Sequence, residues 1–299
     1  MKHKFSVKGQ LNFVLSIVFV TAFLIISLYS YSLAVEDPKE IRFGLIPTES
    51  STQITDRWEP LLDHIAKTMN IKIKPYSASD YAGIIEAMRF GKIEAAYFGP
   101  KSYVEASERS NAWAIAREKM LDGSEGYHSI IITKKGSGLK TFEDIKDKTF
   151  AFNDPNSTSG YLVPMTYFLR DEEIVPEEYF SKVIFSGSHE ASIMTVKLGK
   201  VDAASTNDLD LDRQIQSGRL SLGEFNIIWK SDTIPGSPLV VRGDLSYGFV
   251  MKLQKIITTY SDPKGLEQLQ LAGFVKAIDE DYDPIRAMRE VKDRLRKQN

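Results

Sequence analysis

The chain has 299 residues, with 38 Lys and Arg against 40 Asp and Glu, 42% hydrophobic residues and no cysteine. This composition is typical of a folded globular protein. The lack of thiols excludes disulfide scaffolds, zinc ribbons, iron-sulfur clusters, cysteine nucleophiles and a lipid-anchored cysteine. A length near 300 residues predicts two domains of about 100 to 150 residues each.

The first 34 residues have the pattern of an export signal. Three lysines precede an apolar run over residues 11–28 and the small-residue site Ser32-Leu33-Ala34. The apolar run is close to the length that spans a bilayer, so an uncleaved membrane anchor remains an alternative to cleavage after Ala34. In both cases we expect the rest of the chain to be periplasmic.

Net charge and missing motifs exclude several function classes. Without residues 1–34 the chain has 35 basic and 40 acidic residues, a net charge near −5, whereas nucleic-acid binding requires a basic surface. The sequence contains no Walker A loop, no G-x-S-x-G and no H-E-x-x-H, and it has only four histidines. We therefore expect no nucleic-acid partner, no metal, no cofactor and no enzymatic activity.

Short β-type runs alternate with helical ones from Ile41 onward, which predicts an α/β protein with mainly parallel sheets. A strand at 41–46 is followed by a helix whose apolar residues extend to Met69. A strand at 71–74 comes next, and then a helix that begins after the cap Asp80 and ends at Gly91. Further strands are predicted at 95–98, 112–116, 129–133, 149–152, 183–185, 201–205, 227–229 and 239–242, and a last helix at 285–296.

One segment of the sequence is echoed 108 residues later. Residues 88–96 and 196–204 both read as a helix end, a glycine cap and a new strand. A common helix-to-strand junction that arose twice would explain this, and so would two lobes of similar construction. In the second case the segments 121–128 and 231–238, rich in Gly, Ser and Pro, carry the chain between the lobes. We then expect one lobe from residues 40–127 and 235–299, and the other from residues 128–234.

Three consecutive hydroxyl residues mark a candidate anion site. Ser157, Thr158 and Ser159 lie between the strand at 149–152 and a helix that begins near Gly160. A helix N-terminus presents free backbone N–H groups and a positive dipole end to an anion. Helix capping alone is the alternative interpretation, but three hydroxyls exceed what capping one helix needs.

Three further residues share this position at the start of a helix or at a crossing between lobes. His189 opens a helix, where we expect a neutral ring that donates one hydrogen bond. Tyr81 opens another helix, and Tyr127 lies in a crossing segment. A surface histidine and half-buried aromatics are the alternatives. Ligands bind at the carboxyl ends of strands in open α/β sheets, which favours one shared site.

Six segments of the chain carry a resemblance to a known family: 44–50, 80–85, 122–127, 154–160, 187–190 and 234–238. Together they resemble the periplasmic binding proteins of phosphonate, phosphite and phosphate ABC transporters. The resemblance implies a two-lobe type II periplasmic binding fold that closes about a hinge, traps a phosphorus oxyanion and delivers it to a membrane permease. It implies that Ser157, Thr158 and Ser159 bind the phosphonyl oxygens, together with Tyr81, Tyr127 and His189. We expect the receptor to act as a monomer.

Two departures from the family bear on the ligand. Members that hold aminoethylphosphonate pair its ammonium with two carboxylates, whose positions here are Leu209 and Ser237. A buried ammonium without an acid is costly, so we expect phosphite or methylphosphonate to be preferred, with Ser237 at the substituent. Asp208 and Asp210 flank Leu209, so a one-residue slip would restore an acid. A secreted enzyme and a membrane-anchored sensor on the same fold are the rival functions.

Overall fold

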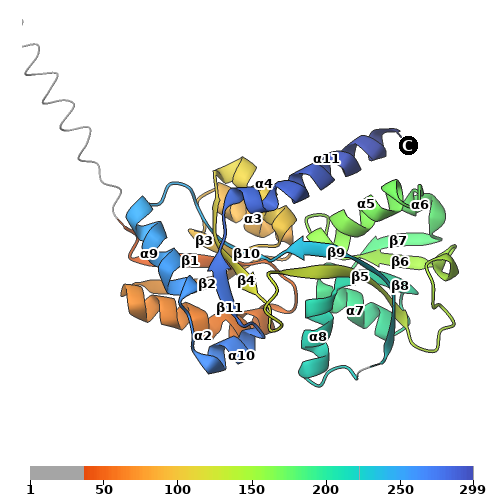
Figure 1. Ribbon diagram of the computed structural model, residues 1–299, viewed down its shortest axis with the longest axis horizontal. Helices are drawn as coiled ribbons and strands as arrows, with labels where there is room; N and C mark the ends of the chain where they lie inside the picture. The colour runs from red at the N-terminus through yellow and green to blue at the C-terminus, as the bar shows by residue number, and fades with distance from the viewer. Residues whose placement is uncertain (1–36, 222, 299) are drawn as a thin grey trace, which may run out of the picture. The chain divides into compact units, whose positions relative to one another are not determined.

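The structure is a computed structural model that describes residues 37–221 and 223–298. In this part of the chain the strands form one six-stranded and one five-stranded sheet, each at the centre of a lobe (Figure 1). We call these the first lobe and the second lobe. The predicted export signal over residues 1–34 lies outside the described residues.

The first lobe has the strand order β11-β4-β10-β3-β1-β2. Its longest helix, α2, begins after Ser50, whose hydroxyl accepts from the Gln53 N–H, and buries Trp58, Leu61 and Ile65 at helical spacing. The strands are β1 (Glu40–Leu45), β2 (Lys72–Ser77), β3 (Ala95–Tyr97), β4 (Trp113–Lys119), β10 (Pro238–Val241) and β11 (Gly273–Lys276). The helices are α2 (Ser51–Met69), α3 (Tyr81–Arg89), α4 (Pro100–Ser110), α9 (Tyr247–Thr258) and α10 (Pro263–Leu269).

The second lobe has the strand order β7-β6-β8-β5-β9. An aromatic cluster around Phe150, Phe152 and Phe168 fills one face of its sheet. The strands are β5 (Gly126–Lys134), β6 (Thr149–Phe152), β7 (Lys182–Phe185), β8 (Ala203–Asn207) and β9 (Phe225–Pro235). The helical segments are η1 (Glu143–Ile145), η2 (Thr158–Leu162), α5 (Val163–Arg170), α6 (Pro176–Tyr179), α7 (His189–Lys197) and α8 (Asp208–Gln216).

The two sheets share a common plan. In the first lobe three parallel strands, β2-β1-β3, are followed by antiparallel β10. In the second lobe the parallel strands β7-β6-β8 are followed by antiparallel β5. The echoed segments lead from α3 to β3 and from α7 to β8, through left-handed Gly91 (φ 63°) and Gly199 (φ 66°). The echo therefore occupies equivalent places in two similar lobes.

The prediction of mainly parallel sheets is wrong. Among the described residues four strand pairs are parallel and five are antiparallel. The antiparallel pairs all involve β10, β11, β5 or β9. Strands β5, β9 and β10 adjoin the crossings between the lobes and enter each sheet from the opposite direction, whereas β11 follows α10 and pairs with β4. Strand β11 had no counterpart among the predicted strands.

The two crossings form a hydrogen-bonded ribbon where loops were expected. Strand β5 begins within the first crossing, β9 ends within the second, and the register pairs Gly126 with Pro235 and Tyr127 with Ile234. In Figure 1 β5 and β9 run side by side at the edge of the second lobe's sheet and reach toward the first lobe. We call this pair of strands the crossing ribbon. The exact lobe boundaries, 127/128 and 234/235, stay a prediction.

Replacing Gly126 by alanine is expected to destabilise the protein by about 1 to 3 kcal/mol. The added Cβ would lie 2.4 Å from Thr233 Cγ2 and 2.5 Å from the Ile234 carbonyl oxygen, so the crossing ribbon would have to distort. Chemical denaturation measures the change. The matched control is Gly248→Ala in helix α9, where a Cβ meets nothing within 4 Å and alanine favours the helix. Equal stability changes in the two variants would contradict the prediction.

Helix α11 (Asp283–Gln298) contacts both lobes. Near its start, Arg289 Nη1 donates to Glu108 Oε2 of α4 at 2.9 Å. At its end, Arg296 Nη1 donates to Glu177 Oε2 of α6 at 2.9 Å. Figure 1 shows the helix extending from α4 of the first lobe toward α5 of the second. The helix predicted at 285–296 is confirmed, with slightly wider bounds.

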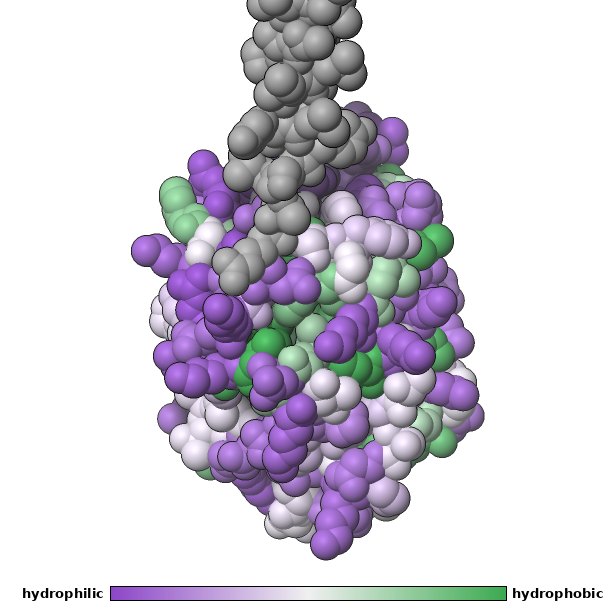
Figure 2. Space-filling view, turned by 90° about the vertical axis from the view of Figure 1, so that its left-hand side faces the viewer, coloured by the Kyte–Doolittle hydropathy of each residue, from purple (hydrophilic) through white to green (hydrophobic). Residues whose placement is uncertain are grey.

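The outer surface is largely polar where the figures show it. The end of the first lobe that faces the viewer in Figure 2 is mostly hydrophilic, with small separate apolar areas. Within residues 37–221 and 223–298 no helix is both long enough and apolar enough to cross a membrane.

Candidate ligand-binding site

All seven residues proposed from the sequence line one small cavity between the lobes. Each is at most 6% exposed. The cavity has a volume of about 20 Å³, which suits a small ion and not a peptide or a sugar. These residues are Tyr81, Tyr127, Ser157, Thr158, Ser159, His189 and Ser237.

The three hydroxyls form a cradle at the start of η2, a single turn of π-helix that leads into α5. Ser157 caps this turn, and its Oγ accepts from the Gly160 N–H at 3.0 Å. The Thr158 hydroxyl accepts from the Lys101 N–H at 2.8 Å, and the Ser159 hydroxyl accepts from Asn207 Nδ2 at 3.4 Å. A hydroxyl that accepts from the protein keeps its own proton for donation. The cradle can therefore present three O–H donors to an anion.

Helix capping therefore explains the hydroxyl of Ser157 but not those of its two neighbours. Thr158 accepts from a donor of the first lobe, Ser159 accepts from a donor at the start of α8, and neither residue caps η2. The turn also depends on glycine. A Cβ at Gly160 would lie 2.3 Å from Asn153 Cβ and 2.9 Å from Ser157 Oγ, so any side chain there would displace the cradle.

Five helix N-termini meet at the cavity, which gives it a positive potential without a free cation. The cavity wall includes Tyr81 at the start of α3, the α4 cap Gly99, the cradle at the start of η2, His189 at the start of α7 and the α8 cap Asn207. Each N-terminus stabilises a nearby negative charge by roughly 0.3 to 1 kcal/mol, and by up to about 2 kcal/mol when partly buried. The site is therefore suited to a multiply charged anion.

The two tyrosines are neutral donors. Burial raises the pKa of Tyr81 well above its usual range, and the nearby Asp210 and Asp154 carboxylates add to the effect. Burial likewise raises the pKa of Tyr127, against a smaller lowering by Ser159 and Thr158. Both phenols keep their protons at any physiological pH, so each can donate to an anion.

His189 lies beside the cradle on the second-lobe wall of the cavity. Its Nε2 lies 3.5 Å from Ser157 Oγ, and its Nδ1 lies 3.0 Å from Thr206 Oγ1. Burial lowers the pKa of the ring, Asp210 opposes that shift, and Arg213 reinforces it. In the unliganded cavity this favours the neutral ring expected from the sequence.

The structure adds cavity residues beyond the seven: Asp210, which the sequence offered only through a one-residue slip, and Arg213, Tyr97 and Asn207, which it did not offer. Asp210 and Arg213 line the cavity as an ion pair, with Arg213 Nη1 donating to Asp210 Oδ1 at 3.1 Å. The second oxygen of Asp210 accepts from Asn207 Nδ2 at 2.8 Å. Tyr97 also lines the cavity and donates to the buried Glu118 Oε1 at 3.1 Å. Asn207 could have been found, because it follows a strand and caps a helix as Ser157 does, but the ion pair gives no sequence signal of a site.

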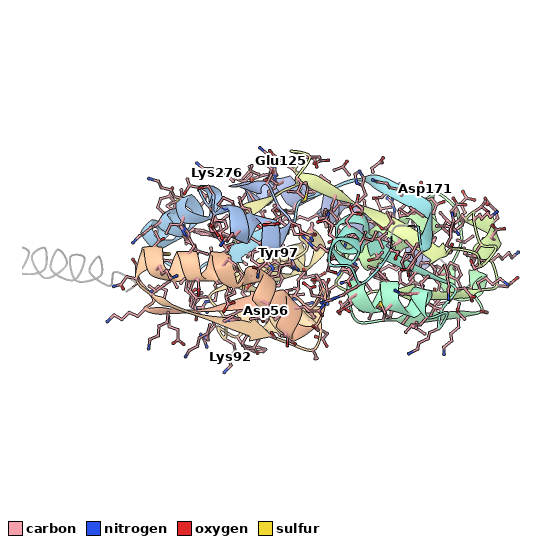
Figure 3. All side chains as sticks on the ribbon, turned by 90° about the horizontal axis from the view of Figure 1, so that it is seen from below. Asp56, Lys92, Tyr97, Glu125, Asp171 and Lys276 are labelled. Atoms are coloured by element: carbon pink, nitrogen blue, oxygen red, sulfur yellow. The ribbon has the colours of Figure 1, made fainter. Side chains whose placement is uncertain are left out.

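Figure 3 distinguishes Tyr97 from its surface neighbours. Tyr97 lies inside the first lobe, whereas Lys92 and Lys276 lie on the outside of the same lobe. The two departures noted in the sequence, Leu209 and Ser237, both line the cavity. Asp210 lines it as well, whereas Asp208 does not.

The sequence matches the family model described as "ABC transporter, phosphonate, periplasmic substrate-binding protein" over residues 43–282. The chain belongs to this family. It is 37% identical to the phosphonates-binding periplasmic protein of Escherichia coli over 284 residues, which covers 91% of this chain and 82% of that protein. Members of the family are substrate-binding components of transporters and not enzymes, which excludes the secreted enzyme considered above.

Two solved structures are similar to the structure of this family member. The binding protein component of an ABC phosphonate transporter from Pseudomonas aeruginosa superimposes with a TM-score of 0.82 at 35% identity, covering 87% of this chain and 88% of that one. A protein of Prochlorococcus marinus in complex with methylphosphonate gives a TM-score of 0.77 at 24% identity, covering 85% and 98%. The two-lobe periplasmic binding fold is confirmed. Family membership implies a phosphorus oxyanion as ligand and a permease as partner.

Proposed function

We propose that this receptor captures phosphite or methylphosphonate in preference to aminoethylphosphonate, and that it passes the anion to its permease. The seven predicted residues would hold the ligand. Ser157, Thr158 and Ser159 would donate to its oxygens from one side and His189, Tyr81 and Tyr127 from the others. Charge-assisted hydrogen bonds of this kind contribute about 1.5 to 3 kcal/mol each, so five or six of them are sufficient for tight binding after the cost of ordering is met.

The observation that carries the ligand preference is the state of Asp210. It is a carboxylate at the cavity wall, but Arg213 neutralises it and Arg213 and Asn207 occupy its two oxygens. Leu209 beside it is apolar, and Ser237 offers only a hydroxyl. An ammonium group on the ligand would therefore find only a carboxylate that Arg213 and Asn207 already share, and no acid of its own. The methylphosphonate named in the Prochlorococcus marinus complex carries no amine and agrees with this proposal.

Calorimetry with phosphite, methylphosphonate, phosphate and aminoethylphosphonate tests the proposal. We expect phosphite or methylphosphonate to bind at least about a hundredfold more tightly than aminoethylphosphonate, because an unpaired buried charge costs about 3 to 5 kcal/mol. Preference for the aminated compound would overturn the ligand assignment. Preference for phosphate would retain the site and change only the fourth group on phosphorus.

We further propose that the mature receptor is a periplasmic monomer, cleaved after Ala34, which opens and closes about the crossing ribbon. The export signal of the sequence and the family's periplasmic location support this. Mass spectrometry and size measurement of protein from the periplasmic fraction test it. An intact N-terminus in the membrane fraction would instead support the anchored sensor.

A further inference from the structure

The side chains around the cavity carry no net positive charge that would balance a bound dianion. Asp210 and Arg213 cancel each other, and both are at most 7% exposed. Behind them Arg57 is paired with Glu49, with Nε 2.7 Å from Oε1. Burial raises the pKa of Glu118, which favours its neutral form although Arg213 and Arg57 oppose the shift. A doubly negative ligand enclosed here thus lacks a compensating ion among these residues.

The other polar groups that face His189 do not change this balance. The phenols of Tyr81, Tyr97 and Tyr127 line the same cavity and stay protonated. The Asp154 carboxylate of the cradle loop accepts from the Tyr81 N–H. Lys101 turns its ammonium toward Asn156 at 3.1 Å and Glu105 at 3.5 Å. Of the cavity-lining groups, His189 alone can gain a positive charge near neutral pH.

The ring is placed so that a proton would be stabilised from both sides. Nε2 points at the cradle, where the ligand oxygens would lie, since it is 3.5 Å from Ser157 Oγ. On the other side, Nδ1 is 3.0 Å from Thr206 Oγ1 and 3.2 Å from Asn207 Nδ2, and the Asp210 carboxylate lies behind them, with Oδ2 at 4.0 Å. Asp210 itself is fixed by Arg213 and Asn207. An imidazolium would therefore lie between two negative groups once the ligand is bound.

We propose that His189 takes up a proton from solvent when the anion binds, and that Asp210 is the positioning residue that makes this uptake possible. The proton adds to the unprotonated ring nitrogen and no other bond changes. The inference rests on the proposed function and specifies the charge state in which the site holds its ligand. It gives the buried Asp210 carboxylate at the wall of an anion site a role beyond its pairing with Arg213.

The direction of the pH dependence follows from linkage. Burial lowers the pKa of His189, and a dianion held against Nε2 would raise it. Between these two pKa values the complex holds about one more proton than the free components, so affinity increases as pH falls through that window. Above the window the ring is neutral in both states and the additional affinity is lost.

Nitrogen NMR of the mature protein, with labelled histidine side chains, tests the proposal directly. With phosphite and then methylphosphonate as probes near neutral pH, we expect the His189 ring to change from imidazole to imidazolium on saturation. Calorimetry in buffers of different ionisation enthalpy should show a proton uptake that matches the protonation of His189. The uptake measured with His189→Gln gives the part that comes from titration of the ligand itself. A ring that stays neutral in the complex would overturn the proposal.

Asp210→Asn is expected to return His189 to the neutral form in the complex and to remove its share of the proton uptake. The control is Asp208→Asn in the same helix. Asp208 pairs with His128 Nδ1 at 2.8 Å and Lys230 at 3.3 Å and does not line the cavity, so the His189 signal should be unchanged. Retained uptake in Asp210→Asn would remove the role of Asp210. Binding without proton uptake would overturn this inference alone. A failure to bind either phosphite or methylphosphonate would overturn the proposed function as well.

Discussion

Replacing Ser157 and Thr158 together by alanine is expected to weaken binding of the preferred phosphorus oxyanion by about 10²- to 10⁴-fold. Each hydroxyl would lose a charge-assisted hydrogen bond of about 1.5 to 3 kcal/mol. Both hydroxyls already accept from backbone N–H groups, so their protons are directed away from those donors. Calorimetry with methylphosphonate and phosphite measures the loss.

Loss of a helix cap alone must be separated from loss of the donors. Ser246→Ala is the matched control, because Ser246 caps α9 by accepting from the Phe249 N–H at 3.1 Å and does not line the cavity. It should cost about 0.5 to 2 kcal/mol of stability and leave affinity unchanged. If the double variant kept its affinity for every phosphorus oxyanion, the cradle would have no role in binding.

Introducing acids at the two departures, as Leu209→Glu with Ser237→Asp, is expected to increase affinity for aminoethylphosphonate by about a hundredfold or more. Both positions line the cavity, and a charge-assisted bond to a buried ammonium contributes about 1.5 to 3 kcal/mol. Affinity for methylphosphonate should fall, since the new carboxylates have no counter-ion in its complex. Calorimetry with both ligands measures the exchange of preference.

The control for this double variant is Leu121→Glu, which makes the same leucine-to-acid change at an exposed position outside the cavity. It should alter neither affinity. Thermal unfolding of the double variant verifies that the fold is intact. A folded double variant with no gain for aminoethylphosphonate would show that the ligand's substituent points elsewhere.

The sequence was sufficient for the cradle because its signal is local. Ser157, Thr158 and Ser159 are adjacent, and Tyr81 and His189 each follow a helix cap that the chain spells out. The parallel cores of both lobes were predictable for the same reason, since the parallel strands alternate with helices that end at left-handed residues such as Asn70, Gly91 and Gly199.

The features that were missed depend on partners far away in the sequence. Asp210 and Arg213 are three residues apart on a short helix, a pattern that normally lies on a solvated surface, and only the approach of the first lobe buries them. Likewise, Gly, Ser and Pro near residues 126 and 235 indicate loops locally. They become strands because each supplies the missing hydrogen-bond partner of the other across more than 100 residues.

The pairing of β5 with β9 restricts how the two lobes can move relative to each other. Two independent linkers would allow many relative orientations of the lobes, but two hydrogen-bonded strands must bend together. In the proposed hinge motion such a joint restricts the lobes to one direction of bending, along which the walls that carry Ser157 and Tyr81 approach or separate. The permease would then recognise the receptor by whether its two lobes are apart or together.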